Sequence, residues 1–598
     1  MDKKRKDIRM KLLLTTLNSK YIHTNLAIRY LKNSVVDVID NVNLVEFTIN
    51  QRKEYILGEI YKIQPDVIGF SCYIWNIEMI HEIAKLLKKV MPHITIIFGG
   101  PEVSFSPEKI MQENDAIDMI IMGEGEKTFK TLIQNLKYNE DYSQIPGMAF
   151  RAKGEIFINN KVGIVPEMEQ ITFPYKDEII DKNKIVYYES SRGCPFNCQY
   201  CLSSTSGGVR FRPLEIVKEE IKYLVDQGVQ QVKFVDRTFN AKKDYAMEIM
   251  EHIIAINKGK TNFHFEVTAD LIEEDMLEFL STVPTGLFQF EIGVQSTNQE
   301  TLKDIQRQMD FDKLGSVVKR ISKGKNIHQH LDLIVGLPRE DYFSFRKSFD
   351  DVFTLRPEKL QIGFLKLLKG SGIRRDSSQY QYIYDDKPPY EVLESDAMSY
   401  GEIVKLKGME EMVEVYWNSN MFASTVEIIL ENFYDSSFKF FEDLWEYWEA
   451  LGYHHLSHSR NKLYEILLEF YSYKGFEKSE VIKEVLKFDY IKHNKTTSLP
   501  GVLYTPFPNN FKNKCHEFLQ EIENLKKYLP KYMELPAKEI IKKVYFQHFD
   551  YNVILLEEKP EILNNINKDE TILLFDYNIE NKAIEQCRYF RLPTIEFI

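Results

Sequence analysis

Two long stretches of this sequence alternate short apolar runs with helix-patterned segments, and this alternation restricts the possible folds more than any other feature. In residues 10–136, the apolar runs at 67–71 and 94–98 are separated by the amphipathic segment 77–90. Strands that are apolar along their whole length and are joined by helices are typical of a parallel sheet covered on both faces. We therefore predict a doubly wound α/β domain with a five-stranded parallel sheet over residues 10–136.

The second stretch, residues 185–370, repeats the strand-then-helix pattern six times. Its expected strands lie at 185–190, 231–236, 263–268, 287–294, 329–335 and 359–366. Six such repeats predict a partial (β/α)6 barrel related to the TIM barrel. The catalytic face of such a barrel lies where the strands end.

The remaining parts of the chain differ in pattern. Residues 137–184 are a predicted connector that contains a hairpin, with 147–151 pairing to 155–158. Residues 371–598 are a C-terminal extension in which helical periodicity and aromatic side chains dominate through 485, and we interpret these aromatic residues as core. Strand-like runs near the end predict a small terminal α/β part; they lie at 552–556, 571–576 and 588–592.

The cysteines are few and unevenly placed. There are six in 598 residues, and three of them fall within residues 194–201, whereas a secreted disulfide framework would distribute them in pairs. No apolar run approaches the ~20 residues of a membrane helix, and the charged N-terminus is not followed by a signal-peptide pattern. We expect a cytoplasmic protein with no membrane partner. The formal net charge of -12 gives no indication of nucleic-acid binding, so the substrate is expected to be a small molecule.

Cys194, Cys198 and Cys201 have the spacing C-x-x-x-C-x-x-C and directly follow the first predicted barrel strand. Thiolates from one short loop can bind three corners of a cubane iron–sulfur cluster. No fourth cysteine is near in the sequence, so one iron keeps an open coordination site. The alternative is a zinc loop, but zinc sites usually have four ligands, often in two knuckles, and no partner knuckle exists here. We predict a [4Fe–4S] cluster on these three cysteines.

The loop resembles the signature of the radical S-adenosylmethionine (SAM) superfamily, including the aromatic Tyr200 just before the last cysteine. The resemblance covers about residues 185–370. It implies that the amine and carboxylate of SAM bind the open iron, and that one electron then releases a 5′-deoxyadenosyl radical. Segments similar to the family's other SAM contacts follow in order. They imply these SAM-binding residues: Tyr200, Asp236, Glu291, Gln295 and Gly336.

Several of these residues also have a purely structural interpretation. Asp236 could cap a helix, Glu291 could be a strand charge that requires a partner, and Gly336 could belong to a turn that ends a strand. We favour SAM contacts for these three residues. Arg237 could hold a carboxylate or pair with a surface acid, and we leave its role open.

A five-stranded parallel domain ahead of such a barrel resembles the cobalamin-binding subclass of the superfamily, whose N-terminal domain is Rossmann-like. Glycines permit close approach of the backbone to a ligand, and free amides at a helix start suit a phosphate. The resemblance implies cobalamin contacts at the ends of the third, fourth and fifth strands: Ser71, Gly99, Gly100, Pro101, Gly123, Glu124 and Gly125. The alternative is an ordinary doubly wound domain with turn glycines, or one that binds another ligand.

The loop after the first strand departs from the pattern of cobalamin domains that ligate cobalt. Those domains use D-x-H-x-x-G, whereas Tyr21 stands two residues before His23 here and no glycine follows at the expected place. We therefore expect His23 to be a loop or helix-start residue, and cobalamin to be bound without a protein histidine on cobalt. An open lower face favours methyl transfer from methylcobalamin to a carbon radical.

The C-terminal extension is similar, more loosely, to that of a bacterial group of cobalamin-type radical SAM proteins, in which the extension has no assigned function. The leading hypothesis is a radical SAM methyltransferase that acts on an unactivated carbon of an unknown substrate and receives electrons from a reductant such as flavodoxin or ferredoxin. No catalytic side chain is assigned.

Three alternatives stay open at this point. The first is a non-methylating enzyme that catalyses a rearrangement or cyclisation with the same cofactors, and the second is a cofactor-binding regulator. The third, a tRNA-modifying methylthiolating enzyme, would require a second set of three cysteines, and the N-terminal domain contains only Cys72.

Overall fold

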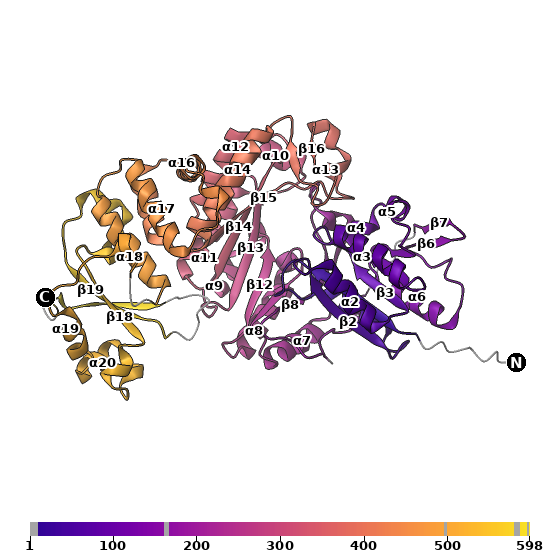
Figure 1. Ribbon diagram of the computed structural model, residues 1–598, viewed down its shortest axis with the longest axis horizontal. Helices are drawn as coiled ribbons and strands as arrows, with labels where there is room; N and C mark the ends of the chain where they lie inside the picture. Colours follow the sequence, from indigo (N-terminus) through magenta and orange to yellow (C-terminus); the bar gives the residue numbers. More distant parts are fainter. Residues whose placement is uncertain are drawn as a thin grey trace. The chain divides into compact units, whose positions relative to one another are not determined.

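The computed structural model describes residues 10–160, 165, 167–176, 178–495, 499–578, 587–594 and 597. Its contacts divide the chain into two compact units, and Figure 1 labels their elements. The first unit comprises residues 1–342 and 363–400, and the second comprises residues 343–362 and 401–598. No described helix combines the length and the apolar character needed to cross a membrane.

The first unit begins with a sheet in the order β2-β1-β3-β4-β5-β6-β7. The strands are β1 (Leu12–Asn18), β2 (Val42–Thr48), β3 (Val67–Ser71), β4 (Thr95–Gly99), β5 (Met119–Ile121), β6 (Met148–Ala152) and β7 (Glu155–Asn159). The first five are parallel, which confirms the predicted doubly wound sheet. The strand order changes direction between β1 and β3, and ligands of such folds bind at the carboxyl ends of the strands beside this point.

Both faces of this sheet are covered by helices, because successive residues of each strand point to opposite faces. Leu13 and Leu17 of β1 belong to one core, with helices α2 (Lys53–Ile63) and α3 (Ile77–Val90). Leu12 and Leu14 belong to the other core, with helices α1 (Leu26–Val35) and α6 (Glu126–Tyr138).

The hairpin predicted in the connector forms as β6 and β7, but it also pairs to β5 in antiparallel orientation. The five predicted parallel strands are therefore extended by two antiparallel strands, and the N-terminal sheet has seven strands in all. Residues 148–159 extend this sheet instead of only linking two domains.

The six strands expected in the barrel all form, in the order β15-β14-β13-β12-β11-β8. They are β8 (Ile185–Tyr188), β11 (Gln231–Phe234), β12 (Asn262–Val267), β13 (Phe288–Gln295), β14 (His328–Val335) and β15 (Lys359–Phe364). The helices between them include α7 (Leu214–Asp226), α8 (Lys243–Ile256), α9 (Glu274–Leu280), α10 (Gln299–Asp304), α11 (Phe311–Gly324) and α12 (Tyr342–Phe353).

The barrel strands alternate apolar residues that face the helices with polar residues that face the inside. On β14, Leu331 and Leu333 are fully buried, whereas His328, His330 and Asp332 lie on the other face. Gln329 confirms the direction, since its amide donates to the carbonyl of Val318 in helix α11. The face of β14 that points to the inside of the barrel is therefore polar.

The second unit contains helices α14 (Tyr400–Val413), α15 (Ala423–Phe433), α16 (Ser437–Ala450), α17 (Arg460–Tyr473) and α18 (Ser479–His493). Phe440, Phe441 and Trp448 of α16 are buried, which agrees with their interpretation as core. An antiparallel sheet follows, formed by β18 (Val544–Phe549), β19 (Thr571–Asp576) and β20 (Arg588–Leu592).

The strand expected at 552–556 was wrong. These residues begin helix α22 (Val553–Glu558), because the side chain of Asn552 accepts a hydrogen bond from the Leu555 amide at 3.2 Å and caps the first turn. Asparagine is among the preferred N-cap residues, and its cap outweighs the β preference of the apolar run that follows.

Candidate cofactor site

The three-cysteine loop is closed at its base by a two-stranded antiparallel ribbon. Strand β9 (Ser191–Cys194) pairs with β10 (Gly208–Phe211), and Cys194 lies opposite Gly208. Gly193 has φ +109°, and a Cβ atom there would lie 2.0 Å from the carbonyl oxygen of Gly208. Only glycine fits where the two strands approach so closely. The ribbon therefore fixes both ends of the cysteine loop, which comprises residues 194–207.

The thiols of this loop lie in different local surroundings. Cys198 is buried, the Cys194 Sγ lies 3.9 Å from Thr238 Oγ1, and the Cys201 Sγ accepts a hydrogen bond from the Ser203 amide at 3.4 Å. Burial raises the pKa of Cys194, and the neighbouring Cys201 and Cys198 raise it further. A metal centre offsets this resistance of the thiol to deprotonation, because it binds the thiolate form.

Within the described ranges, no group of three or more His, Cys, Asp or Glu side chains is gathered closely enough to hold a single metal ion. Thiolates that bind a cubane attach to different irons and do not converge on one point. Three thiols spread along one bounded loop therefore fit a cluster as the group to be held.

Asp236 fastens the chain just before the cysteine loop. It is 1% exposed, and its carboxylate accepts hydrogen bonds from the Ser190 amide at 3.0 Å, the Ser190 hydroxyl at 2.6 Å and the Ser191 hydroxyl at 2.6 Å. Burial raises the pKa of Asp236 to about 6, against the lowering effect of these hydrogen bonds. Both oxygens have protein partners, so the structure gives Asp236 a positioning role, and its predicted contact with SAM stays a prediction.

Arg307 was not singled out by sequence reasoning, yet it lies beside the cysteine loop. Its Nη1 donates toward the Cys198 Sγ at 3.9 Å and the Tyr200 hydroxyl at 3.3 Å, and its Nη2 donates to the carbonyl of Gly293. Its Nε is buried without a hydrogen-bond partner among the described residues. A buried guanidinium with an unused donor is suited to a carboxylate.

Tyr200 lies next to this guanidinium. Burial raises the pKa of its phenol, so it is neutral at physiological pH. The sequence contains one usable signal for Arg307, since it is a charged residue that follows the short helix after the segment 291–296, which contains Glu291 and Gln295. Its contact with the cysteine loop depends on folding across more than a hundred residues, which local pattern does not reveal.

Glu291 is at the centre of a charged cluster on the inner face of the barrel. Its Oε2 accepts from Lys233 Nζ at 2.9 Å and lies 3.0 Å from His264 Nε2. Burial raises the pKa of Glu291, but the hydrogen bond with His264 and the charge of Lys233 lower it to about 2. Burial also raises the pKa of Glu266 and of Asp332. The structure thus gives Glu291 one partner on the neighbouring strand β12 and one on β11, and its contact with SAM stays a prediction.

Gln295 is the last residue of β13, and Gly336 directly follows β14. Gln295 has φ +72°, which is uncommon for a residue other than glycine. Its side chain folds back over Gly293, where a Cβ atom would lie 2.3 Å from Gln295 Nε2. Gly336 has φ +86°, and its carbonyl accepts a hydrogen bond from the Tyr382 hydroxyl at 2.8 Å. Both residues lie at the carboxyl edge of the barrel, the edge that carries the cysteine loop.

The predicted cobalamin residues lie at the carboxyl edge of the N-terminal sheet. Ser71 ends β3, Gly99 ends β4, and Pro101 begins the short helix α4 (Pro101–Ser104). At Gly100, with φ +111°, a Cβ atom would lie 2.5 Å from the carbonyl oxygen of Cys72, so the loops after β3 and β4 touch through backbone alone. Gly123 has φ +70°, and its amide donates to Ser104 Oγ at 3.2 Å.

Asn76 holds the point where the strand order reverses. It is 1% exposed, and its amide donates to the carbonyls of Leu17 and Ser71, each at 3.1 Å. It therefore joins the ends of β1 and β3. Beside it, the rings of Tyr73 and Trp75 stack with centroids 4.5 Å apart.

Glu124 and Gly125 have a different setting from the other predicted cobalamin residues. Glu124 pairs with Arg210 and, at 3.4 Å, with Arg192, and it accepts from the amide of Val165 at 2.7 Å. Burial raises the pKa of Glu124, but the hydrogen bond from Arg210 and the other interactions lower it overall. Its carboxylate thus joins the sheet to the base of the cysteine loop. Gly125 is the N-cap residue of helix α6, and a Cβ atom there would lie against the side chains of Leu31 and Ile121.

His23 contacts the barrel. Its Nδ1 lies 2.8 Å from the Tyr187 hydroxyl, and its backbone forms a parallel bridge with Ile185 of β8. Burial, with the charges of Lys20 and Lys233, lowers the pKa of His23. Its ring thus has a protein partner on the first barrel strand, in keeping with the expectation that it is a loop residue.

Comparison with known families identifies three regions. The model described as "B12 binding domain" matches residues 12–133, and the model "Radical SAM superfamily" matches residues 188–352. The model described as "Protein of unknown function (DUF4080)" matches residues 378–575. The chain therefore contains a B12-binding domain, a radical SAM domain and a C-terminal region that matches a family of unknown function. The radical SAM domain implies a [4Fe–4S] cluster and SAM as cofactors, and the B12-binding domain implies cobalamin.

The cobalamin-dependent radical SAM methyltransferase TokK of Streptomyces tokunonensis is 26% identical over 54% of this chain and 50% of its own length. The uncharacterized methyltransferase PH0819 of Pyrococcus horikoshii is 32% identical over 47% of this chain and 62% of its own length. The match thus spans 50% and 62% of the length of these two curated relatives.

Among solved structures, the radical SAM methyltransferase TsrM of Kitasatospora setae is similar with a TM-score of 0.54 and 16% identity. This similarity covers 64% of this chain and 80% of TsrM. At this identity the likeness concerns the fold.

Proposed function

We propose that the chain is a SAM- and cobalamin-dependent radical methyltransferase that acts on an unactivated carbon of a small molecule. One observation supports this most strongly: the same side chain holds both cofactor loops. Arg192 stands two residues before Cys194, and it pairs with Glu124, in the loop after β5, at 3.4 Å and with Glu126, the first residue of helix α6, at 2.8 Å. A direct link between the cluster loop and the cobalamin edge suits a reaction that uses both cofactors on one substrate.

When bound, the cluster with SAM supplies a 5′-deoxyadenosyl radical, and cobalamin supplies the methyl group. The residues of the chain bind and position these groups. We assign the cluster to Cys194, Cys198 and Cys201, and the carboxylate of SAM to Arg307.

The polar rim of the barrel and the loops of the sheet hold the rest of the two cofactors. We assign the remaining polar groups and the adenine of SAM to Tyr200, Gln295 and Gly336. Glu291 is a further SAM contact in this proposal, and Lys233 and His264 fix the position of its carboxylate. The cobalamin contacts are Ser71, Gly99, Gly100, Pro101 and Gly123, where bare backbone lies at the carboxyl edge of the sheet.

The partners of this reaction are a small-molecule substrate and an external one-electron reductant such as flavodoxin or ferredoxin. The polar inner face of the barrel supports a substrate that is held by hydrogen bonds and charges. Such a reductant would supply the one electron that reductive cleavage of SAM consumes.

The test is an anaerobic incubation of reconstituted protein with SAM and a reductant, in which both products of SAM are quantified. We expect 5′-deoxyadenosine that depends on the cluster, and S-adenosylhomocysteine that depends on added cobalamin. The Cys198→Ala variant removes the first product, and omission of cobalamin removes the second. Deoxyadenosine without cobalamin-dependent S-adenosylhomocysteine would contradict methyl transfer and favour a rearrangement or cyclisation.

A further inference from the structure

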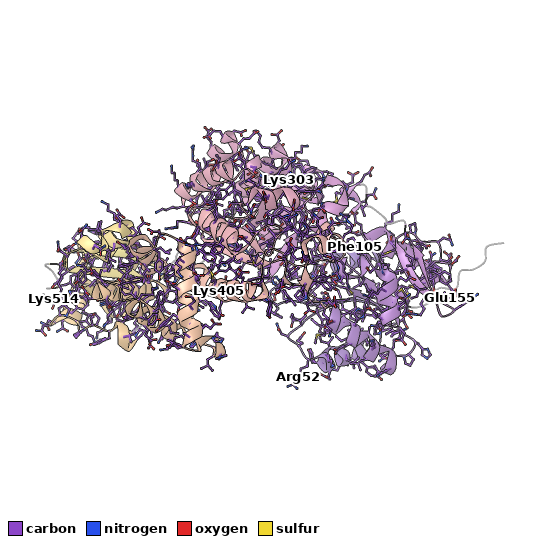
Figure 2. All side chains as sticks on the ribbon, turned by 90° about the horizontal axis from the view of Figure 1, so that it is seen from above. Arg52, Phe105, Glu155, Lys303, Lys405 and Lys514 are labelled. Atoms are coloured by element: carbon purple, nitrogen blue, oxygen red, sulfur yellow. The ribbon has the colours of Figure 1, made fainter. Side chains whose placement is uncertain are left out.

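The first unit contains a cavity of about 730 Å³ outside the barrel. One wall is formed by helix α3, by helix α5 (Pro107–Glu113) and by Phe105, and the other is formed by residues 369–390. A Cβ atom at Gly370 would lie 2.3 Å from the ring of Phe105, so the walls meet there. Figure 2 labels Phe105 at this junction. A volume of this size accommodates a small organic molecule.

The wall formed by residues 369–390 contacts both cofactor loops. In helix α13 (Gly372–Arg375), the amide of Ile373 donates at 3.0 Å to the carbonyl of Gln199, a residue of the cysteine loop. At the far end of the same wall, the Tyr390 hydroxyl donates at 2.7 Å to Glu102, which follows Gly99 and Gly100. A molecule in the cavity therefore lies beside the loops that we assign to the cluster and to cobalamin.

The lining of the cavity has five basic and three acidic side chains, although the whole chain has a formal net charge of -12. The basic ones are Lys109, Lys369, Arg374, Arg375 and Lys387, and the acidic ones are Glu78, Glu113 and Asp386. Three of the basic side chains have a carboxylate partner: Lys109 lies 3.8 Å from Glu113, Lys369 lies 3.5 Å from Glu102, and Arg375 lies 3.1 Å from Asp376. Burial, with the charges of Lys369 and Lys85, lowers the pKa of His81 to about 4, so this imidazole is neutral at pH 7 and offers a hydrogen bond. Cations concentrated in a concave site raise the local concentration of an anion.

Arg374 is the basic residue best prepared for an anion. Its guanidinium lies 4.7 Å from the ring centre of Tyr390 and 5.4 Å from that of Tyr384, and it donates to the carbonyl of Leu367 at 2.6 Å. In the described part of the chain it has no carboxylate partner. The aromatic rings hold the planar fork in place and leave its charge uncompensated, which is the arrangement that recognises phosphate.

We propose that this cavity binds a phosphate group of the small-molecule substrate, with Arg374 as the main ligand and Lys109, Lys369 and Lys387 as supporting cations. The identification of the bound molecule as the substrate rests on the proposed function, whereas the phosphate site itself does not. A phosphate held here anchors one end of a molecule whose other end reaches the two cofactors. Binding energy from such a remote anchor orients the reacting carbon.

The experiment measures binding of inorganic pyrophosphate by isothermal titration calorimetry to protein that is already loaded with cluster and cobalamin. We expect saturable binding of one pyrophosphate per chain that weakens as salt is added. Arg374→Gln should weaken binding by about tenfold, the loss expected when one charge-assisted hydrogen bond is removed. Lys109→Gln with Lys387→Gln should weaken it by about threefold or more, since both side chains are exposed and their charges are screened.

The matched control is Arg52→Gln, which removes the same charge from an exposed residue of the same unit, well apart from Phe105 in Figure 2. The control should bind pyrophosphate as the native protein does. The two lysine substitutions serve as a second test if Arg374→Gln fails to fold, because they remove no packing.

Three outcomes would overturn the inference. They are the absence of saturable binding, equal binding by the control and the Arg374 variant, and binding that appears only before cobalamin is added. The last outcome would assign the site to the phosphate of cobalamin itself. Failure here leaves the deoxyadenosine and S-adenosylhomocysteine assay unaffected, whereas failure of that assay leaves pyrophosphate binding intact, so the two proposals are tested separately.

Discussion

The guanidinium of Arg307 points at the Sγ of Cys198 across 3.9 Å, so a buried cation lies beside the loop that carries the three cysteines. The same Nη1 donates to Tyr200, and the neighbouring Nε has no partner within the described residues. This relationship joins the strand β13 side of the barrel to the cysteine loop. It gives the site a fixed positive charge where an anionic group of the cosubstrate is expected.

Replacing Arg307 with glutamine should weaken the binding of SAM by ~10-fold or more while iron content stays unchanged, because one charge-assisted pair is lost. The dissociation constant of labelled SAM, measured by anaerobic equilibrium dialysis on reconstituted protein, checks this. Arg307→Lys keeps the positive charge but loses the planar guanidinium, so its affinity for SAM should lie between those of the native protein and the glutamine variant. An Arg307→Gln variant with native affinity for SAM would remove this residue from the site.

Cys198→Ala should abolish the cluster, because three thiolates are the minimum that holds a cubane with one open iron. Iron and sulfide per chain should fall to background, and deoxyadenosine should no longer form. Cys515→Ala is the matched control, since Cys515 is also buried but belongs to the second unit. The account is wrong if Cys198→Ala retains a full cluster, or if Cys515→Ala loses it.

Asp236 gives the folded chain a pH dependence of known sign. Burial raises its pKa from 3.8 to about 6. Between these values the folded chain holds a proton that the unfolded chain has released, so this contribution to stability is present at low pH and is lost as pH rises through about 6. From about pH 4.5 to pH 6.5 the loss should be roughly 2 kcal/mol in the native protein.

Asp236→Asn should lack that slope, since an amide does not ionise. Urea unfolding of the apo protein at both pH values provides the comparison. The variant should also bind less iron, because the amide nitrogen that replaces Oδ2 cannot accept the hydrogen bond from the Ser190 backbone amide. If the free energy of unfolding changed with pH equally in the two proteins, the pKa of Asp236 would not be raised in the folded chain.

The pair of Glu291 and Lys233 on the inner face of the barrel permits a double-mutant test. Glu291→Gln leaves Lys233 unpaired and should destabilise the first unit by about 3–5 kcal/mol, whereas Glu291→Gln with Lys233→Met should recover much of that loss. Both variants should lose deoxyadenosine formation, which separates stability from catalysis. Thermal unfolding with the activity assay measures both effects. Recovery of activity together with stability in the double variant would contradict a role for Glu291 in the site.

Much of the fold follows from local pattern, because apolar runs such as 67–71 and 94–98 fit only buried parallel strands. The six barrel strands were predictable for the same reason, as was the bounded loop of the three cysteines. The strand expected at 552–556 failed because one side chain, Asn552, caps a helix there. A cap of this kind acts through a single hydrogen bond and leaves the hydrophobic pattern unchanged.

The site was less predictable than the fold. Pairs such as Arg192 with Glu126 and Arg307 with Cys198 join residues 66 and 109 positions apart. Their contact depends on how the sheet and the barrel pack, and periodicity carries no information on that. The partners of Asp236 and Glu124 were hidden for the same reason, so residues interpreted as cofactor contacts also proved to hold the loops in place.

The central claim is that Cys194, Cys198 and Cys201 hold a cluster with one iron left open for SAM. Mössbauer spectroscopy of protein reconstituted with enriched iron, recorded before and after SAM is added, tests it most directly. The account predicts a cubane in which a single iron site changes its spectrum when SAM binds. A spectrum that SAM leaves unchanged, or a loop that takes up zinc in place of iron, would contradict it.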